Sequence, residues 1–158
     1  IRYCNLDIPP TCSVAEYYLS EATNSFILGT LDRETVDFNS SAWSLAVKPN
    51  WDIEHIKGNI DLFVNFISFQ EMEPAVVENY MNHVTTLNPK WILLRHIREG
   101  KQKLSETNPV GVKEPTTPDL YDSLLIDFEQ MHRDSTPFGF ITADNFHSEV
   151  LVYRAINP

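Results

Sequence analysis

The sequence has few cations and few cysteines for its length. Of 158 residues, 12 are Lys or Arg and 22 are Asp or Glu, which gives a formal net charge of -10. The cations are scattered, whereas nucleic acid and anionic membrane surfaces both require clustered positive charge, so neither is expected as a partner. Cys4 and Cys12 are the only cysteines, and their spacing fits neither a zinc pair nor a disulfide framework. A reducing, cytoplasmic location is the simplest interpretation.

Long hydrophobic runs and glycine are also scarce. The longest apolar run, from Ile60 to Ser68, is far shorter than the ~20 residues that cross a bilayer. The five glycines include no G-x-G pair. The chain begins at Ile1, already inside an apolar segment and without a signal peptide, and we expect it to be the C-terminal part of something longer. Hydrophobic residues make up 42% of the sequence, which is enough to fill a sizeable core.

Strand patterns alternate with helix patterns along the chain. The expected strands are 1–10, 25–31, 42–51, 60–68 and 90–97, and the expected helices are 11–24, 73–89 and 120–133. The run 60–68 is apolar on both faces, which is typical of a strand in a parallel sheet covered by helices on both sides. Residues 98–119 form a long polar loop, and 138–156 predict a hairpin that turns at Asp144 and Asn145. The pattern indicates an α/β sheet, mostly parallel, with an antiparallel C-terminal hairpin strand.

Unusual polar residues follow the predicted strands. In open α/β sheets, ligands bind beyond the carboxyl ends of the parallel strands. The residues expected at this rim are Asp7, Ser68, Gln70, Glu71, Arg95, His96, Arg98, Asp144, Asn145 and His147. One edge of the sheet therefore collects most of the unusual polar residues.

Three segments carry a resemblance to a known family. They are "LDIPPTCSVAEYYLS", "DLFVNFISFQEMEPAVVENYM" and "NFHSEVLVYR". Together with the order of the strands, they resemble the last two-thirds of class I S-adenosylmethionine-dependent methyltransferases and, more narrowly, the sugar O-methyltransferases found with bacterial surface-polysaccharide genes. The resemblance implies a Rossmann-like fold, S-adenosylmethionine as cofactor, and a sugar or nucleotide-sugar substrate.

The sequence departs from this family in one respect. The family's glycine-rich loop follows its first strand, which would precede Ile1, and that strand lies between the second and fourth strands of the family's sheet. We therefore expect an upstream segment, and interpret residues 1–158 as a single, incomplete methyltransferase domain.

The resemblance assigns roles to the residues at the rim. Asp7 would accept hydrogen bonds from the ribose hydroxyls of the cofactor, because a carboxylate offers two acceptor oxygens and no donor. Asn65, Ser68 and Gln70 would also bind the cofactor. The acceptor hydroxyl needs a general base, for which the candidates are His96, His147 and Glu71, with His96 the most economical because it ends a buried strand. Glu71 could instead anchor a loop through backbone N–H groups.

The remaining polar residues suggest substrate contacts but no metal. Arg95, Arg98 and Asp144 are the candidates for substrate binding, and the forked donors of the arginines match phosphate or carboxylate. The alternative, which such clusters more often represent, is a solvated loop with surface ion pairs. Asp144, His147 and Glu149 match no strong metal signature, so we predict no metal. A catalytically silent α/β domain that binds protein or glycan is the alternative function. The oligomeric state is open, with a homo-oligomer among the options.

Overall fold

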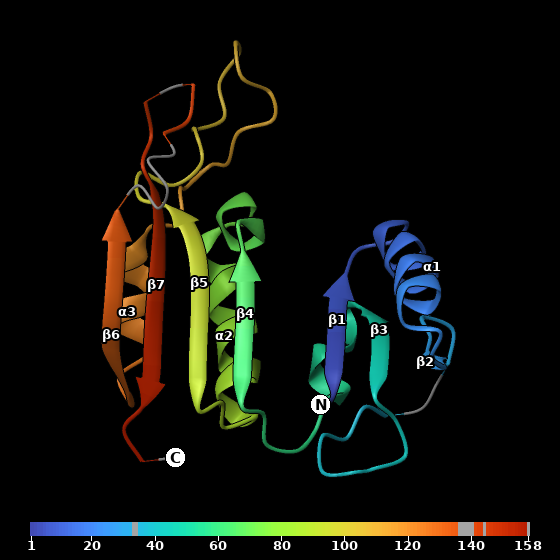
Figure 1. Ribbon diagram of the computed structural model, residues 1–158. Helices are drawn as coiled ribbons and strands as arrows, with labels where there is room; N and C mark the ends of the chain where they lie inside the picture. The colour runs from blue at the N-terminus through green and yellow to red at the C-terminus, as the bar shows by residue number, and fades with distance from the viewer. Residues whose placement is uncertain (33–34, 136–140, 144, 158) are drawn as a thin grey trace. The chain divides into compact units, whose positions relative to one another are not determined.

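The computed structural model describes residues 1–32, 35–135, 141–143 and 145–157. The chain forms two compact units, Ile1–Asn59 and Ile60–Pro158 (Figure 1). No described helix is both long and apolar enough to cross a membrane.

The first unit is a small parallel sheet with one helix. Its elements are β1 (Tyr3–Asp7), α1 (Thr11–Thr23), β2 (Ile27–Leu28), β3 (Leu45–Pro49) and the 3₁₀ turn η1 (Asn50–His55). The strand order is β1-β3-β2, and both pairs are parallel. Cys12 of α1 packs with Ile27 and Val47 in the core. The helix ends at Thr23 because Asn24 turns into the left-handed region at φ 49°.

A buried lysine holds the loop that follows β2. Lys48 lies in β3, and its Nζ donates to the backbone oxygens of Gly29 at 2.9 Å and Asp32 at 2.5 Å. Burying a cation without partners is costly, so these carbonyl dipoles are what makes the position tolerable. Lys48 therefore stabilises the loop from inside this unit and does not belong to an exposed cationic patch.

The second unit has a four-stranded sheet. Its elements are β4 (Leu62–Phe66), η2 (Ser68–Glu71), α2 (Pro74–Thr86), β5 (Trp91–Ile97), α3 (Pro118–Leu124), β6 (Phe128–Ser135) and β7 (Ser148–Ala155). The strand order is β4-β5-β7-β6; β4 and β5 are parallel, and β7 is antiparallel to both of its neighbours. This confirms the predicted sheet, mostly parallel with one antiparallel strand.

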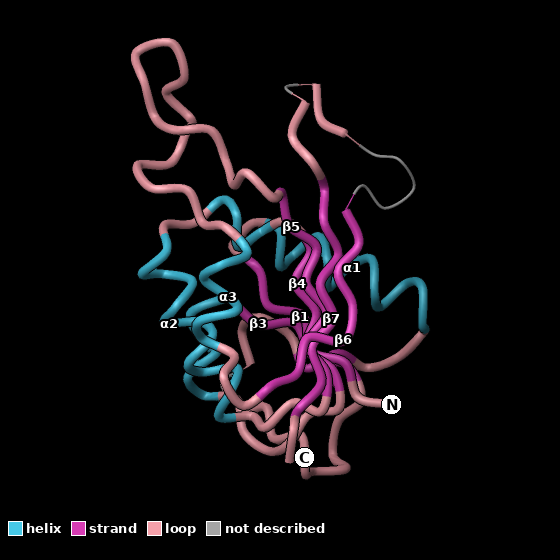
Figure 2. The backbone as a smooth tube through the Cα atoms, turned by 90° about the vertical axis from the view of Figure 1, so that its left-hand side faces the viewer, coloured by secondary structure: helices cyan, strands magenta, loops and turns pink. Residues whose placement is uncertain are grey.

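Helices α2 and α3 lie on the same face of this sheet (Figures 1 and 2). Helix α2 starts with Pro74, whose fixed φ suits a first turn. It buries Val77, Met81 and Val84, which share one side of the helix because they are spaced by four and three residues. The loop between β5 and α3 extends past the carboxyl ends of β4 and β5 (Figures 1 and 2).

The structure corrects the expectation that the strand in 60–68 is covered on both faces. Leu62, Val64 and Phe66 are exposed, Phe66 by 55%. Strand β4 is at the edge of its sheet with β5 as its neighbour, and both described helices of this unit lie on the opposite face. The apolar run therefore marks an edge strand with one open face.

The helix predicted over 120–133 is wrong in its second half. Helix α3 ends at Leu124, and β6 begins at Phe128. Apolar spacing favours a helix locally, but pairing with β7 supplies a full ladder of backbone hydrogen bonds, so tertiary context overrides the local pattern. The long partner of β7 is thus β6, although Ile141 also bridges His147. Residues 138–140 and 144 of the predicted hairpin lie outside the described part of the chain.

Candidate active site

A sharp turn ends β4 and is built by two predicted cofactor residues. Ile67 has φ 73°, a conformation that is strained for a β-branched side chain. Asn65 stabilises the turn from both ends of its amide: Nδ2 donates to Ser68 Oγ at 2.7 Å, and Oδ1 accepts the Phe69 N–H at 3.2 Å. Asn65 and Ser68 are therefore held against each other at the end of the strand.

Gln70 connects this turn to the next strand. Its side chain is buried, and Oε1 accepts the N–H of Ile97 at 3.0 Å. Its Nε2 faces Glu71 Oε1 at 3.4 Å, and Glu71 also forms an ion pair with Lys101 at the start of the long loop. Glu71 is thus a partly exposed carboxylate that fixes the loop through a lysine side chain.

His96 lies inside the unit, with both ring nitrogens bonded. It is 1% exposed; Tyr121 Oη lies 3.1 Å from Nδ1, and Nε2 lies 2.9 Å from the carbonyl oxygen of Thr116. A carbonyl can only accept, so Nε2 carries the proton and Nδ1 accepts from the tyrosine. Burial lowers the pKa of His96 to about 4, against hydrogen bonding to Thr116, which raises it. The neutral imidazole joins β5 to α3 and the long loop.

His147 forms a dyad with Glu99 at the rim. The carboxylate of Glu99 accepts the backbone N–H of His147 at 2.8 Å and lies 2.6 Å from its Nδ1. Partial burial raises the pKa of Glu99, but the hydrogen bonds from the ring and backbone of His147 outweigh it, and the net pKa is lowered. An ionised carboxylate holds the proton on Nδ1 and leaves Nε2 as an acceptor. The His147 side chain is 38% exposed, so this arrangement can present a base to a ligand.

Two arginines converge on a fully buried carboxylate. Arg98 Nε donates to Glu149 Oε1 at 2.5 Å, and Arg133 Nη2 lies 2.9 Å from Oε2. Burial raises the pKa of Glu149, yet hydrogen bonds from Arg98, Arg133 and Ser135 lower it further than burial raises it. Glu149 is therefore an ionised anchor for both guanidinium groups. The third predicted arginine, Arg95, donates to Ser148 Oγ at 3.1 Å.

Sequence reasoning missed Glu99, Arg133 and the anchoring role of Glu149. Glu99 lies in the predicted loop, and only the antiparallel pairing of β5 with β7 brings it to His147, as the bond from the Arg98 N–H to the His147 oxygen shows (2.8 Å). Arg133 lies in the segment predicted as helix. Finding either residue required the strand pairing, which single-residue patterns do not carry.

The other predicted residues lie elsewhere. Asp7 ends β1 in the first unit, where its Oδ1 accepts the N–H of Ile8 at 2.8 Å. Asp144 lies outside the residues that the structure describes. The second unit thus brings together the residues Ser68, Gln70, Glu71, Arg95, His96, Arg98 and His147 at the end of its sheet where β4 and β5 terminate. Within the described residues, no three His, Cys, Asp or Glu side chains are grouped as metal ligands.

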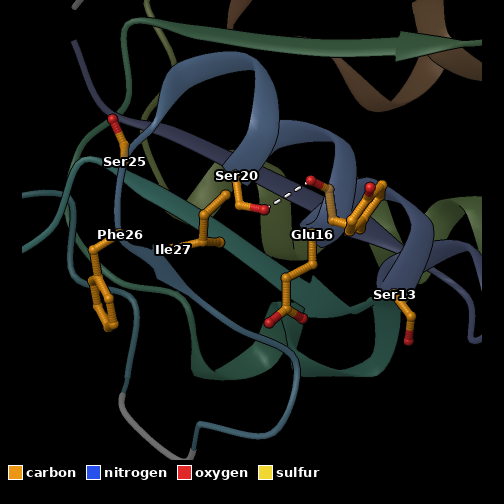
Figure 3. A pocket seen from close by; sticks show the side chains of 7 residues that line it. Ser13, Glu16, Ser20, Ser25, Phe26 and Ile27 are labelled. Atoms are coloured by element: carbon orange, nitrogen blue, oxygen red, sulfur yellow. Dashed lines mark hydrogen bonds between the residues drawn. The ribbon is translucent and has the colours of Figure 1, made fainter.

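A separate cavity of about 550 Å³ belongs to the first unit (Figure 3). It lies between α1 and the segment before β2 and is lined by Ser13, Glu16, Tyr17, Ser20, Ser25, Phe26 and Ile27. The carboxylate of Glu16 accepts from the N–H and hydroxyl of Thr30 at 3.2 and 3.1 Å, and Ser20 Oγ donates to the Tyr17 oxygen at 2.7 Å. None of the predicted site residues lines this cavity.

Solved structures share the fold, although the sequence matches no protein-family model and no curated protein. Magnesium protoporphyrin IX methyltransferase from Synechocystis PCC 6803, solved with bound S-adenosylmethionine, aligns with a TM-score of 0.57 at 10% identity over 98% of this chain and 59% of its own. The Pnkp1/Rnl/Hen1 RNA repair complex gives 0.54 at 13% identity, over 97% of this chain and 31% of the other.

A third structure contains two bound small molecules. It is the 1,6-didemethyltoxoflavin-N1-methyltransferase of Burkholderia thailandensis, bound to 1,6-didemethyltoxoflavin and S-adenosylhomocysteine, which aligns with a TM-score of 0.51 at 12% identity over 98% of this chain and 71% of its own. The chain spans less than two-thirds of the length of the first two structures. These likenesses confirm the predicted Rossmann-like methyltransferase fold.

Proposed function

We propose that the chain takes part in methyl transfer from S-adenosylmethionine to a hydroxyl group of a sugar, in the synthesis of a surface polysaccharide. The fold supports the methyltransferase part, and the sequence resemblance supports the sugar part. The single observation that carries the chemistry is the His147–Glu99 dyad at the end of the sheet where β4 and β5 terminate.

In this proposal, His147 is the general base. Its Nε2 accepts the proton of the sugar hydroxyl while Glu99 holds the proton on Nδ1 and stabilises the imidazolium that forms. Bound S-adenosylmethionine supplies an electrophilic methyl group on a sulfonium centre. His96 cannot serve in the same way, because both of its nitrogens are already bonded inside the unit. We assign it a positioning role, since it fixes the end of β5 from which Arg98 and Glu99 follow.

The cofactor residues fit the proposal to different degrees. Asp7 ends a parallel strand, and among the described residues its carboxylate accepts one hydrogen bond, from the neighbouring N–H of Ile8. A carboxylate can accept several more, as ribose hydroxyls require. Asn65 and Ser68 shape the turn after β4, and Gln70 fixes that turn to β5. We propose that these three hold the backbone that faces the cofactor.

The test is a methyl-transfer assay with labelled S-adenosylmethionine and a panel of sugars, sugar phosphates and oligosaccharides. With the active acceptor, His147→Gln should lower kcat by roughly 10²- to 10⁴-fold, the usual contribution of a general base. Glu99→Gln should lower kcat less, because the base remains but loses its orienting carboxylate. His55→Gln is the matched control, as His55 is an exposed histidine of the first unit. A His147→Gln variant with unchanged kcat would refute the assignment.

A binding module without catalysis is the second candidate function. It is favoured by the open apolar face of β4, where Leu62, Val64 and Phe66 are exposed, since such patches often mark interaction surfaces. Calorimetry with S-adenosylhomocysteine separates the two functions. A heat of binding with thermal stabilisation supports the enzyme, and the lack of both at millimolar ligand supports the module.

A further inference from the structure

Arg98 and Arg133 are two cations that share one anion. Arg98 follows β5, Arg133 belongs to β6, and both meet the carboxylate of Glu149 in β7. Glu149 has 0% of its side chain exposed, whereas the arginine side chains are 39% and 36% exposed. The three groups together carry one net positive charge in a chain with a formal charge of -10.

Much of each guanidinium group is left for another partner. A guanidinium has five N–H donors in a planar fork. Among the described residues, Arg98 bonds Glu149 and the hydroxyl of Ser135, and Arg133 pairs with Glu149. Several donors of each fork are therefore unused by those residues, and both side chains are partly exposed.

The arrangement suits a phosphate better than a neutral sugar. Arginine recognises phosphate oxygens through paired donors, and a fork whose position is already fixed loses less entropy on binding. Glu149 provides that fixation for both arginines. The pKa of Arg133 is raised chiefly by its hydrogen bond to Glu149, and the nearby carboxylate of Asp122 adds to the effect. Asp122 already accepts from Tyr153 Oη at 2.6 Å. This carboxylate weakens the field at Arg133, so the binding of a phosphate alone should be modest.

The arginine pair adjoins the His147–Glu99 dyad. His147 immediately precedes β7 and continues its pairing, since its carbonyl accepts the N–H of Arg98 at 2.8 Å. His147 and Glu149 are two residues apart in extended chain, so they face the same side with Cα atoms roughly 7 Å apart.

We propose that Arg98 and Arg133, held by Glu149, form a phosphate-binding subsite, and that the methyl acceptor is a sugar phosphate ester such as a sugar 1-phosphate or a nucleoside-diphosphate sugar. This inference rests on the proposed function of His147. In the productive complex, the phosphate lies on the two guanidinium groups while the reacting hydroxyl reaches Nε2 of His147.

The direct test is a calorimetric titration with inorganic pyrophosphate. Wild-type protein should bind it with an affinity that falls as salt is added, and Arg133→Gln should weaken binding at least tenfold, as expected for lost hydrogen bonds between charged groups. Arg154→Gln is the matched control, because Arg154 is an exposed arginine on the neighbouring strand that pairs with Glu129 at 2.7 Å. It should bind like the wild type.

A second variant, Arg133→Lys, separates a loss of binding from a loss of folding. Arg133→Gln leaves Glu149 with one cation fewer, so its melting temperature is measured beside Arg133→Lys, which keeps the charge but not the fork. A folded Arg133→Lys that binds pyrophosphate less tightly than the wild type supports the subsite. Equal affinity in wild type, Arg133→Gln and Arg133→Lys, or no binding to the wild type at millimolar pyrophosphate, overturns it.

Kinetics separate this inference from the proposed function. With a sugar phosphate as acceptor, Arg133→Gln should raise KM at nearly unchanged kcat, the opposite of His147→Gln. A sugar 1-phosphate and a nucleoside-diphosphate sugar tested side by side show which ester is used. If a neutral sugar is methylated with a KM that Arg133→Gln does not change, the phosphate-binding subsite is refuted and the proposed methyltransferase activity stands. If pyrophosphate binding depends on Arg133 but no acceptor is methylated, the phosphate-binding subsite stands and the proposed methyltransferase activity is refuted.

Discussion

His96 should make the second unit less stable as the pH falls from neutrality. Its pKa is lowered in the folded state from 6.5 to about 4, chiefly by burial. Between these values, the unfolded chain binds a proton that the folded chain does not bind. The free energy of unfolding is therefore unaffected by His96 titration above pH 6.5, and it falls progressively as the pH drops to about 4.

The size of the effect follows from the two pKa values. Their difference is about 2.5, and each pKa unit corresponds to about 1.4 kcal/mol, so the complete loss in the free energy of unfolding is about 3 kcal/mol. By pH 5 the loss is about 2 kcal/mol. That is a large share of the 5–15 kcal/mol that stabilises a typical domain.

The assay is urea unfolding followed by circular dichroism from pH 8 to pH 5, with wild type, His96→Phe and His132→Gln. His96→Phe should be less stable at pH 8, because Thr116 and Tyr121 each lose a partner, but it should lack the pH-dependent loss of about 2 kcal/mol. His132 is an exposed histidine of the same unit, so His132→Gln should keep the wild-type profile. If wild type and His96→Phe show the same pH dependence, or if NMR gives His96 a titration midpoint near 6.5, the buried neutral imidazole is refuted.

Two further predictions concern the long loop after β5. Gly100→Ala should destabilise the protein by more than about 1 kcal/mol in urea unfolding, because Gly100 has φ 73° and an added Cβ would lie 2.6 Å from the oxygen of Thr116; unchanged stability would contradict this packing. Glu73 precedes α2, and its carboxylate accepts hydrogen bonds from the N–H groups of residues 113 and 114 at 2.8 and 3.0 Å. Glu73→Ala should therefore accelerate amide exchange at residues 113–114, while Glu78→Ala, an exposed change within α2, should not. Because these bonds lower the pKa of Glu73, the wild-type protection should persist below the usual carboxylate range as the pH falls, and its early loss would count against the anchor.

The elements with strong local signals were predictable from the sequence. Strand β5 (Trp91–Ile97) lies within the predicted range 90–97, and helix α2 (Pro74–Thr86) lies within 73–89. In both, the apolar period, the length and a flanking or first-turn proline agree with the fold. Strand β6 was not predictable in this way, because its segment has helical spacing and becomes a strand only through its ladder with β7.

Residue position was more predictable than residue role. The rule that ligands bind at the carboxyl ends of parallel strands placed Ser68, Gln70 and Glu71 after β4, where they lie. Their hydrogen bonds depend on neighbours that are distant in sequence, such as Ile97 for Gln70 and Lys101 for Glu71. A pattern read along one chain segment cannot supply such partners, so a polar residue at the rim can serve the fold, a ligand or both.

A sequence signal could have distinguished His96 from His147 as candidate bases. In "WILLRHI", side chains alternate between the faces of β5, so His96 shares its face with Ile92 and Leu94, and all three are buried. The apolar residues Trp91 and Leu93 on the other face concealed this alternation, because the run looked buried on both sides. Once the face is known, His96 belongs to the core, and the base of the proposed reaction has to be sought outside the buried part of β5. We propose His147 as that base, since it lies just before β7 and Glu99, which follows the neighbouring strand β5, lies 2.6 Å from its Nδ1.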